Sequence, residues 1–397
     1  MNFSRIDENS IYDSSLSFYL RFVWISIALS GIVVFEPAPY DILLTFLFLC
    51  GIIFNKLRIP KYIGKPLILL WLFLASNIIS LFNANEFSAG VRYFLITTYL
   101  LLTWIFFVSF INSYRDKAIW VILSAYTMAA AISAVLGLLA YFDVFSSKYF
   151  NTSGVRLMFG FKDANVYGPF LVFVSLVALA KLESGKFHRQ VLWLALFIAI
   201  ITAIFLSFSR GAWLNAAIAF AVYIILRMLM ASGMGSVFRR LLYVAGIILI
   251  AVLLIHYILQ VPDISRTLMN RLRIQPYDPQ RFHIQRLALS EILYNPLGIG
   301  PLQTRFRYSL GPHNLYIGVF IEYGIMGGFS FIIFVFATLV RALQLITKGD
   351  RKWAWLYPIF AASLLGLLAN SLFIDSLHWR HLWLILAMPW AFQFSDS

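Results

Sequence analysis

The stretch RFHIQRLALSEILYNPLGIGPLQTRFRYSLGPHNLYIGVFIEYGIMG, residues 281–327, is the most polar and arginine-rich part of a strongly apolar chain. It begins after one long apolar run and ends inside the next, which predicts a position at a membrane face. Arginine against a bilayer is costly unless an anion receives it. We therefore expect an anionic ligand near the basic side chains of this stretch, which are Arg281, Arg286, Arg305, Arg307 and His313.

The composition of the whole chain indicates an all-α integral membrane protein. Of 397 residues, 61% are hydrophobic and 12% are charged, and the mean hydropathy is +0.84. Soluble domains are about half apolar and a quarter charged. The net charge of +14 would also suit a nucleic-acid partner. Basic loops that set membrane topology explain it better, so we expect no nucleic-acid partner. The single cysteine, Cys50, excludes an internal disulfide.

Runs of about 20 apolar residues are long enough to cross a bilayer as helices. The first run lacks a small-residue cleavage site and is expected to be an uncleaved anchor. We predict one polytopic domain over residues 1–397, with a long outer loop at about 260–313 between spans nine and ten. The twelve predicted spans lie near 17–35, 40–55, 66–83, 92–112, 118–141, 165–181, 190–208, 212–230, 241–260, 315–343, 354–373 and 379–394.

The short loops alternate in charge along the chain. Basic residues gather at 56–65, 115–117, 181–189, 237–240 and 348–352, whereas the intervening loops hold Glu36, Asp41, Glu86 and Asp375. Positive loops face the cytoplasm, so both termini are predicted to be cytoplasmic. The two long loops, 142–164 and 260–313, then lie outside. The second carries an unexpected excess of arginine over its acids Asp263, Asp278 and Glu291.

Arg210 follows Ser209 at a tight break between two apolar runs. Ser209 is a candidate cap for the next helix, and the helix start with a guanidinium would form an anion site. An interfacial arginine reaching lipid headgroups is the alternative.

Residues 281–294 are predicted to form an amphipathic helix with Ile284, Leu287, Ala288 and Ile292 on one face. Simple headgroup binding by an interfacial helix is again the alternative.

Polar residues at three other predicted helix ends are also candidates. His313, followed by Asn314, suits a general base, although a lone membrane histidine is more often structural. The possible substrate contacts are Lys162, Asp163, Asn165 and Asn314, with Arg156 upstream of the first three, and capping by Asp163 or Asn165 is equally plausible. Asp375, His378 and His381 would share a helical face, but a metal site normally needs a further ligand and supporting partners.

Four segments in order resemble motifs of the bacterial O-antigen ligase superfamily. His313-Asn314, nine residues, then Gly324-Ile325-Met326-Gly327 is similar to its H-N-x9-G-x-x-G pattern. Residues 209–213, SRGAW, resemble its S-R-G-A-W segment, and Arg281 lies fifteen residues before Pro296 of NPLGIG, as in its R…HPL-G-x-G segment. Residues 161–168, FKDANVYG, resemble F-x-D-P-N-x-x-G, with Ala164 in place of the usual proline. The motifs lie from about residue 150 onward, whereas the first 150 residues agree in topology only.

The resemblance implies a GT-C-type membrane glycosyltransferase that works without metal or other cofactor on the periplasmic side of the bacterial inner membrane. Its donor would be a glycan on undecaprenyl diphosphate. With lipid A–core as the acceptor, the enzyme would be an O-antigen ligase. With a second lipid-linked glycan as the acceptor, it would be an O-antigen or exopolysaccharide polymerase. A twelve-helix transporter or flippase is a remoter alternative, since charges gather at helix ends. The resemblance implies diphosphate contacts from Arg210, Arg281 and Arg305 or Arg307, and a catalytic His313.

Overall fold

The structure, a computed structural model, describes residues 8–144, 156–183, 187–231 and 233–394. Every regular element in these ranges is helical, which confirms the predicted all-α class. Besides three short 3-10 turns, the helices are α1 (Glu8–Ala28), α2 (Pro39–Ile53), α3 (Gly64–Leu81), α4 (Phe87–Tyr114), α5 (Asp116–Tyr141), α6 (Ala164–Leu182), α7 (Phe187–Leu206), α8 (Arg210–Leu229), α9 (Met234–Ile258), α10 (Pro262–Leu272), α11 (Asp278–Glu291), α12 (Gln303–Tyr308), α13 (Leu315–Lys348), α14 (Tyr357–Asn370) and α15 (Arg380–Ala391).

Each of the twelve predicted spans overlaps one of these helices, namely α1–α9 and α13–α15. Seven helices of the described residues, α3–α8 and α13, are long and apolar enough to cross a membrane by length and composition. Shorter apolar helices occur at 17–31, 39–53 and 357–370. The chain therefore has the character of a multi-pass membrane protein, and the count of twelve spans stays a prediction.

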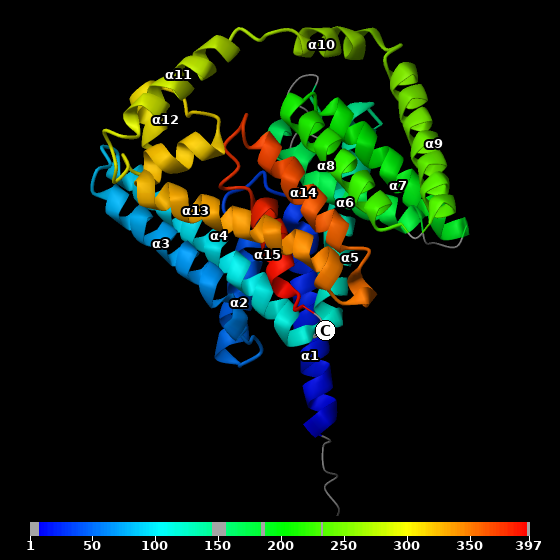
Figure 1. Cartoon of the computed structure of the whole chain (residues 1–397), viewed down its shortest axis with the longest axis horizontal. Coiled ribbons are helices and arrows are strands. Elements are labelled where there is room, and N and C mark those ends of the chain that lie inside the picture. The colour runs from blue at the N-terminus through cyan, green and yellow to red at the C-terminus, as the bar shows by residue number, and fades with distance from the viewer. Residues whose placement is uncertain (1–7, 145–155, 184–186, 232, 395–397) are drawn as a thin grey trace, which may run out of the picture.

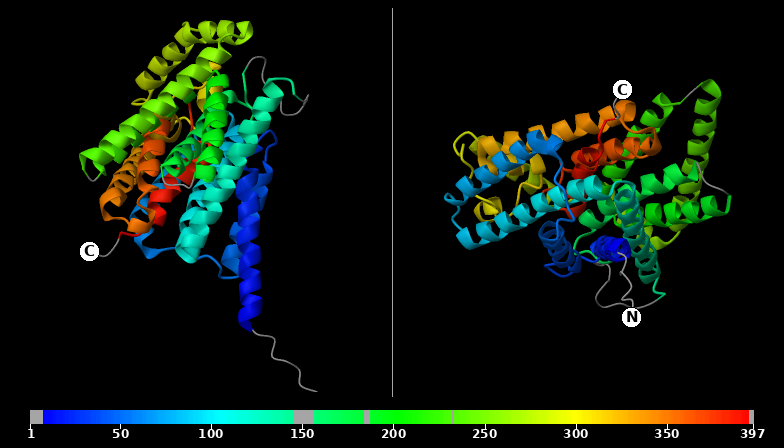
Figure 2. Two further views of the ribbon diagram at one scale, coloured as in Figure 1. Left: turned by 90° about the vertical axis from the view of Figure 1, so that its right-hand side faces the viewer. Right: turned by 90° about the horizontal axis from the view of Figure 1, so that it is seen from below.

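The helices form a bundle that is covered at one end by an arch of α10, α11 and α12 (Figure 1). The closest packing joins elements that are far apart in sequence, because α8 packs on α14, α13 on α3, and α15 on α4. These pairings bring the start of α8 beside the end of α14, directly beneath the arch. Figure 2 shows α1 extending past the rest of the bundle at the end opposite the arch.

The loops sort into two groups at opposite ends of the bundle. At the end away from the arch, Lys352 pairs with Asp116, and the backbone N–H of Arg58 donates to Ser113 Oγ at 2.8 Å. A bridge between Gly349 and Phe394 brings the C-terminal segment to the same end. At the other end, the loop after α1 meets the segment before α6 through the 3.1 Å pair of Lys162 and Glu36. This grouping matches the predicted alternation of loops, and the side that faces the cytoplasm stays a prediction.

Helix α13 is broken at Gly324, whose φ of 77° lies outside the helical region. Backbone groups around the break bond to the loop that follows α11: Ile299 N–H donates to Ile321, Gly300 N–H to Glu322, and Ile325 N–H to Pro296. These bonds satisfy groups that a broken helix would otherwise leave open. The Gly298–Gly300 loop therefore lies directly against the backbone of α13.

The expected amphipathic helix is α11, which begins and ends three residues earlier than predicted. Ile284 and Ala288 are buried, and Ala288 packs with Ile299, Ile317 and Ile321. Leu287, which we placed on the same face, is exposed. This part of the prediction is wrong, because the bundle covers a narrower strip of α11 than a full apolar face. Of the outer loop at 142–164, residues 145–155 lie outside the described part of the chain.

Candidate functional site

A cavity of about 470 Å³ lies between the arch and the ends of α6, α8 and α14. Four guanidinium groups line this arginine cavity, from Arg156, Arg210, Arg271 and Arg281, against a single carboxylate, Asp278. The two predicted arginines Arg210 and Arg281 are therefore brought together, although 70 residues separate them. A concave site with this excess of fixed positive charge is suited to an anion.

Arg210 is the first residue of α8, and its position is set by the local chain. Ser209 Oγ accepts from the N–H of Ala212 at 3.2 Å, which confirms the predicted cap. Gly211 lets α8 approach α14, because a Cβ there would lie 2.2 Å from Asn370 Oδ1. Arg210 Nη2 donates to both carboxylate oxygens of Asp278 at 2.8 Å. The guanidinium is thus held at the cavity wall by a carboxylate of the arch.

Asp278 links the arch to the bundle and remains charged. Burial acts to raise its pKa, but the hydrogen bond from Gln275 N–H (2.9 Å) and the contacts with Arg210 and Arg281 hold that pKa below its ordinary value. A carboxylate with a lowered pKa is an anion throughout the neutral range. It therefore offsets one of the four positive charges that line the cavity.

Arg281 lies on α11, with its guanidinium carbon 4.5 Å from the centroid of the Tyr277 ring. The same tyrosine accepts a 3.0 Å hydrogen bond from Arg271 Nη1 at its hydroxyl. One aromatic side chain thus orients two arginines toward the cavity. Arg281 Nε is buried and has no hydrogen-bond partner in the protein, so this donor remains for a ligand.

Arg156 precedes α6 and approaches the cavity from the opposite wall. Its Nε donates to the carbonyl of Ser207 at 3.0 Å, and its Nη2 donates to Asn165 Oδ1 at 2.8 Å. Burial, together with the nearby charges of Arg271 and Arg281, lowers the pKa of Arg156. A bound anion would relieve this crowding of positive charge.

His313 lies in the loop before α13 with φ of 46°. The neighbouring carbonyl of Pro312 accepts from Gln285 Nε2 of α11 at 2.9 Å, which ties this loop to the arginine cavity. Burial and the charge of Arg281 lower the pKa of His313 to about 4, against the opposing effects of Asp375 and Asp163. Its Nε2 is buried and has no partner in the protein. The imidazole is therefore neutral at neutral pH and able to accept a proton.

The structure does not bring the other predicted arginines to this cavity. Arg307 pairs with Glu291 at 2.9 Å and lines a separate cavity of about 270 Å³ beside Asn83 and Glu86. Arg305 and Arg286 are exposed and lie outside the arginine cavity. The expectation that either Arg305 or Arg307 joins Arg210 and Arg281 is not supported by this geometry.

The four predicted substrate contacts divide among three places. Asn165 lines the arginine cavity, whereas Lys162 and Asp163 line a second, neighbouring cavity. Asp163 caps α6 by accepting from Asn165 N–H at 2.8 Å. Asn314 caps α13, since its Oδ1 accepts from Ile317 N–H at 3.0 Å and its Nδ2 donates to the Leu372 carbonyl at 2.9 Å. Asn314 therefore has a structural role in placing His313.

Asp375, His378 and His381 do not form a ligand cluster, and no group of three His, Cys, Asp or Glu side chains among the described residues is arranged to hold a metal ion. His378 Nε2 instead forms a hydrogen bond with Thr97 Oγ1 at 3.0 Å.

The sequence did not identify three residues of the arginine cavity, which are Arg271, Tyr277 and Asp278. The arginine excess of the outer loop was a signal for Arg271, but only the folded arch shows which arginines face inward.

A search of curated proteins found no match. A comparison with family models matched a segment that includes α8, α9, the whole arch and the break in α13. Residues 194–332, which carry Arg210, Arg281 and His313, match the family model described as O-Antigen ligase, so this part of the chain is similar to that family.

Proposed function

We propose that the protein is a glycosyltransferase that moves a glycan from undecaprenyl diphosphate to a sugar hydroxyl of lipid A–core, as an O-antigen ligase. The observation that carries this proposal is the arginine cavity, where Arg156, Arg210, Arg271 and Arg281 surround a space suited to a diphosphate. It lies at the end of a bundle of apolar helices, where a lipid tail in the bilayer and a polar headgroup outside would meet. The proposal places this end in the periplasm, and the chain in the bacterial inner membrane.

In the proposed reaction, the acceptor hydroxyl oxygen attacks the anomeric carbon of the donor. The bond between that carbon and the phosphate oxygen breaks, and its electron pair leaves with undecaprenyl diphosphate. The proton of the hydroxyl passes to His313 Nε2, which has no partner in the protein. Guanidinium groups stabilise the negative charge that develops on the diphosphate, because they are fixed before the reaction. Arg210 and Arg281 serve this role with Arg156 and Arg271.

The same donor site is compatible with two kinds of acceptor, which give different products. If the acceptor is another lipid-linked glycan, the enzyme is an O-antigen or exopolysaccharide polymerase with the same donor chemistry. Purified protein in nanodiscs, given undecaprenyl-diphosphate glycan and a chelator, distinguishes these possibilities. We expect product on lipid A–core. Ladders formed only on the lipid-linked repeat would make it a polymerase, and a reaction that requires an added metal ion would contradict charge neutralisation by arginine alone.

The control for this assay is a variant of the same arch that leaves the cavity untouched. Arg266 is exposed and forms only a 3.7 Å surface contact with Asp263, and such pairs contribute little. Arg266→Ala should transfer like the wild type, whereas Arg281→Ala should not. Absence of transfer to either acceptor by the wild type, with donor still bound, would overturn the proposed function.

A further inference from the structure

A second cavity, of about 210 Å³, lies beside the arginine cavity on the other side of residues 162–165. Its wall comes from the loop between α1 and α2, the segment before α6, and the start of α15, so it joins three parts of the chain distant in sequence. Asp163 lines this second cavity and Asn165 lines the arginine cavity, and the two residues are bonded through their 2.8 Å cap contact. Ligands in the two cavities would thus meet at one short segment.

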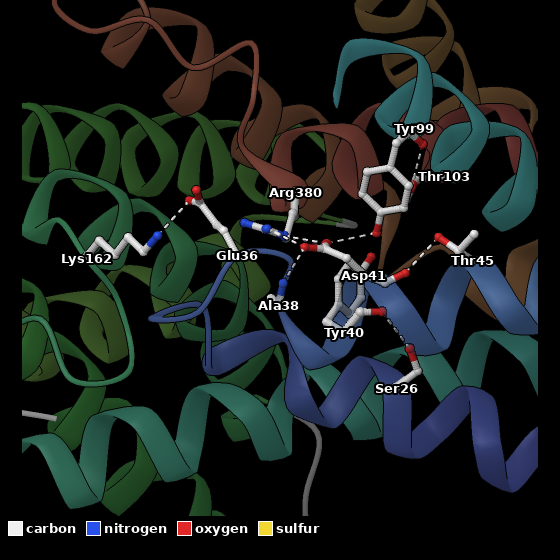
Figure 3. Close-up of polar contacts among 10 residues, drawn as sticks. All are labelled: Ser26, Glu36, Ala38, Tyr40, Asp41, Thr45, Tyr99, Thr103, Lys162 and Arg380. Carbon is white, nitrogen blue, oxygen red and sulfur yellow. Dashed lines mark hydrogen bonds and ion pairs between the residues drawn. The ribbon is translucent and has the colours of Figure 1, made fainter. Parts of the chain in front are cut away.

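The charged groups in the wall of the second cavity already have partners within the protein. Arg380 donates through Nε to Asp41 Oδ1 at 2.6 Å, and Asp41 also accepts from Tyr99 and from the backbone of Ala38 (Figure 3). Lys162 meets Glu36 at 3.1 Å, as Figure 3 also shows. Asp163 caps α6. The wall therefore presents no excess charge, in contrast to the arginine cavity.

Two buried polar groups of the same wall have no hydrogen-bond partner in the protein, Ser30 Oγ and His381 Nε2. Ser30 is 7% exposed and His381 is 4% exposed. A buried polar atom without a partner is unfavourable, and native proteins rarely keep one without a reason. Two residues with such atoms in the wall of one cavity favour a ligand that carries hydroxyl groups.

The rest of the wall is largely aromatic. Tyr40, Phe161, Phe170 and Trp379 line the cavity, and the rings of Trp379 and His381 lie 5.2 Å apart. A sugar ring has C–H faces that pack on aromatic rings and hydroxyl edges that form hydrogen bonds, so it suits a wall with both features. A phosphate suits it poorly, because no unpaired cation is present among the lining residues described here.

We propose that this second cavity binds one neutral sugar ring of the acceptor glycan, with Ser30 Oγ and His381 Nε2 bonding to its hydroxyls. The inference rests on the proposed function, since it supplies the acceptor for the same transfer. His313 lines neither cavity, but its loop is tied to the arginine cavity, because the Pro312 carbonyl accepts from Gln285 Nε2 of the cavity wall at 2.9 Å. The exposed pair of Lys162 and Glu36 stands at the mouth and is of the weak surface kind that a ligand can separate.

Ser30→Ala and His381→Phe test this directly, because neither substitution breaks a hydrogen bond within the protein. At saturating donor we expect each to raise the acceptor KM between threefold and about tenfold, the usual weight of one hydrogen bond. The donor KM should stay unchanged, and inorganic diphosphate should compete with the donor and not with the acceptor. Ser109→Ala is the matched control, since Ser109 Oγ is also buried without a partner but lines neither cavity.

Acceptor KM values within twofold of the wild type for both variants would overturn the inference, and so would a rise in donor KM instead. Ser30→Ala keeps the test decisive if His381→Phe fails to fold. If the wild type transfers to no acceptor, the proposed function fails separately. Binding of the delipidated core oligosaccharide, followed by tryptophan fluorescence, then decides the cavity's ligand: equal affinity of wild type and Ser30→Ala contradicts the inference, and weaker binding by Ser30→Ala supports it.

Discussion

Arg281 combines a ring contact with Tyr277 and a free Nε at the arginine cavity. We expect Arg281→Ala to reduce kcat for transfer by about 10²–10³, the usual effect of removing one preorganised donor. Arg281→Lys should recover little, because an ammonium lacks the planar fork. Steady-state transfer by protein that inserts at wild-type levels is the measurement. Unchanged kcat in Arg281→Ala would contradict its assignment to the donor diphosphate.

Arg271 and Arg305 distinguish the folded arrangement from the sequence-based expectation. Arg271 lines the cavity and is held by Tyr277, whereas Arg305 is exposed outside it. We expect Arg271→Ala to lose at least tenfold in kcat/KM for the donor, by loss of a charge-assisted contact. Arg305→Ala should remain within about twofold, like other exposed charges. The reverse order in the same assay would restore Arg305 as the third donor contact.

The lowered pKa of His313 predicts an unusual pH dependence of the transfer reaction. Its pKa is lowered to about 4, so the imidazole that accepts a proton is the dominant form at neutral pH and is lost only as the pH falls toward 4. We expect kcat/KM to stay level from about pH 8 to about pH 5, whereas an ordinary histidine would titrate near 6.5. Arg281→Gln, which removes a nearby positive charge, should move the midpoint upward. A wild-type midpoint near 6.5 would show that His313 is not held in this environment.

At the scale of elements, the contact between the Gly298–Gly300 loop and the break in α13 explains two glycines of the motifs. Gly298 and Gly324 both have positive φ, and a Cβ on either would lie within 2.5 Å of the other segment's backbone. We expect Gly324→Ala to destabilise by more than the about 1–3 kcal/mol of a backbone conformation that is essentially restricted to glycine, because of that clash. Thermal unfolding in detergent measures it, with Gly311→Ala as the control in open space. Equal Tm values for the two variants would count against the break as a fixed element.

The elements also show what the sequence predicts and where it stops. Apolar runs locate most helices within a few residues, because burial in lipid requires a fixed length, whereas α1 and α9 begin nine and seven residues before the predicted spans. Caps such as Ser209 and Asp163 were predictable from residue type. The side of the arch that faces inward was not predictable from residue type. Helix α11 turns Arg281 inward and Arg286 outward because of its packing on residues that are distant in sequence. Leu287 was misplaced for the same reason.

For the molecule as a whole, the two groups of loops predict its orientation in the membrane. Basic loops favour the cytoplasm, so the arch should lie on the other side. In a Cys50→Ser background, a membrane-impermeant thiol reagent applied to spheroplasts should label Arg266→Cys and leave Arg351→Cys unlabelled. Both side chains are exposed, so access depends on the membrane alone. Permeabilised cells, in which both variants react, are the control, and the opposite pattern in intact spheroplasts would invert the predicted topology.

The ion pair of Arg210 with Asp278 has a consequence for which ligands the protein retains. Any incoming anion competes with a tethered carboxylate that is always present at high local concentration. Chloride, acetate and other singly charged ions gain too little to displace it, whereas a diphosphate offers several oxygens at once to the remaining arginines. The resident carboxylate thus favours ligands that carry several negative charges over singly charged ions from the surrounding salt.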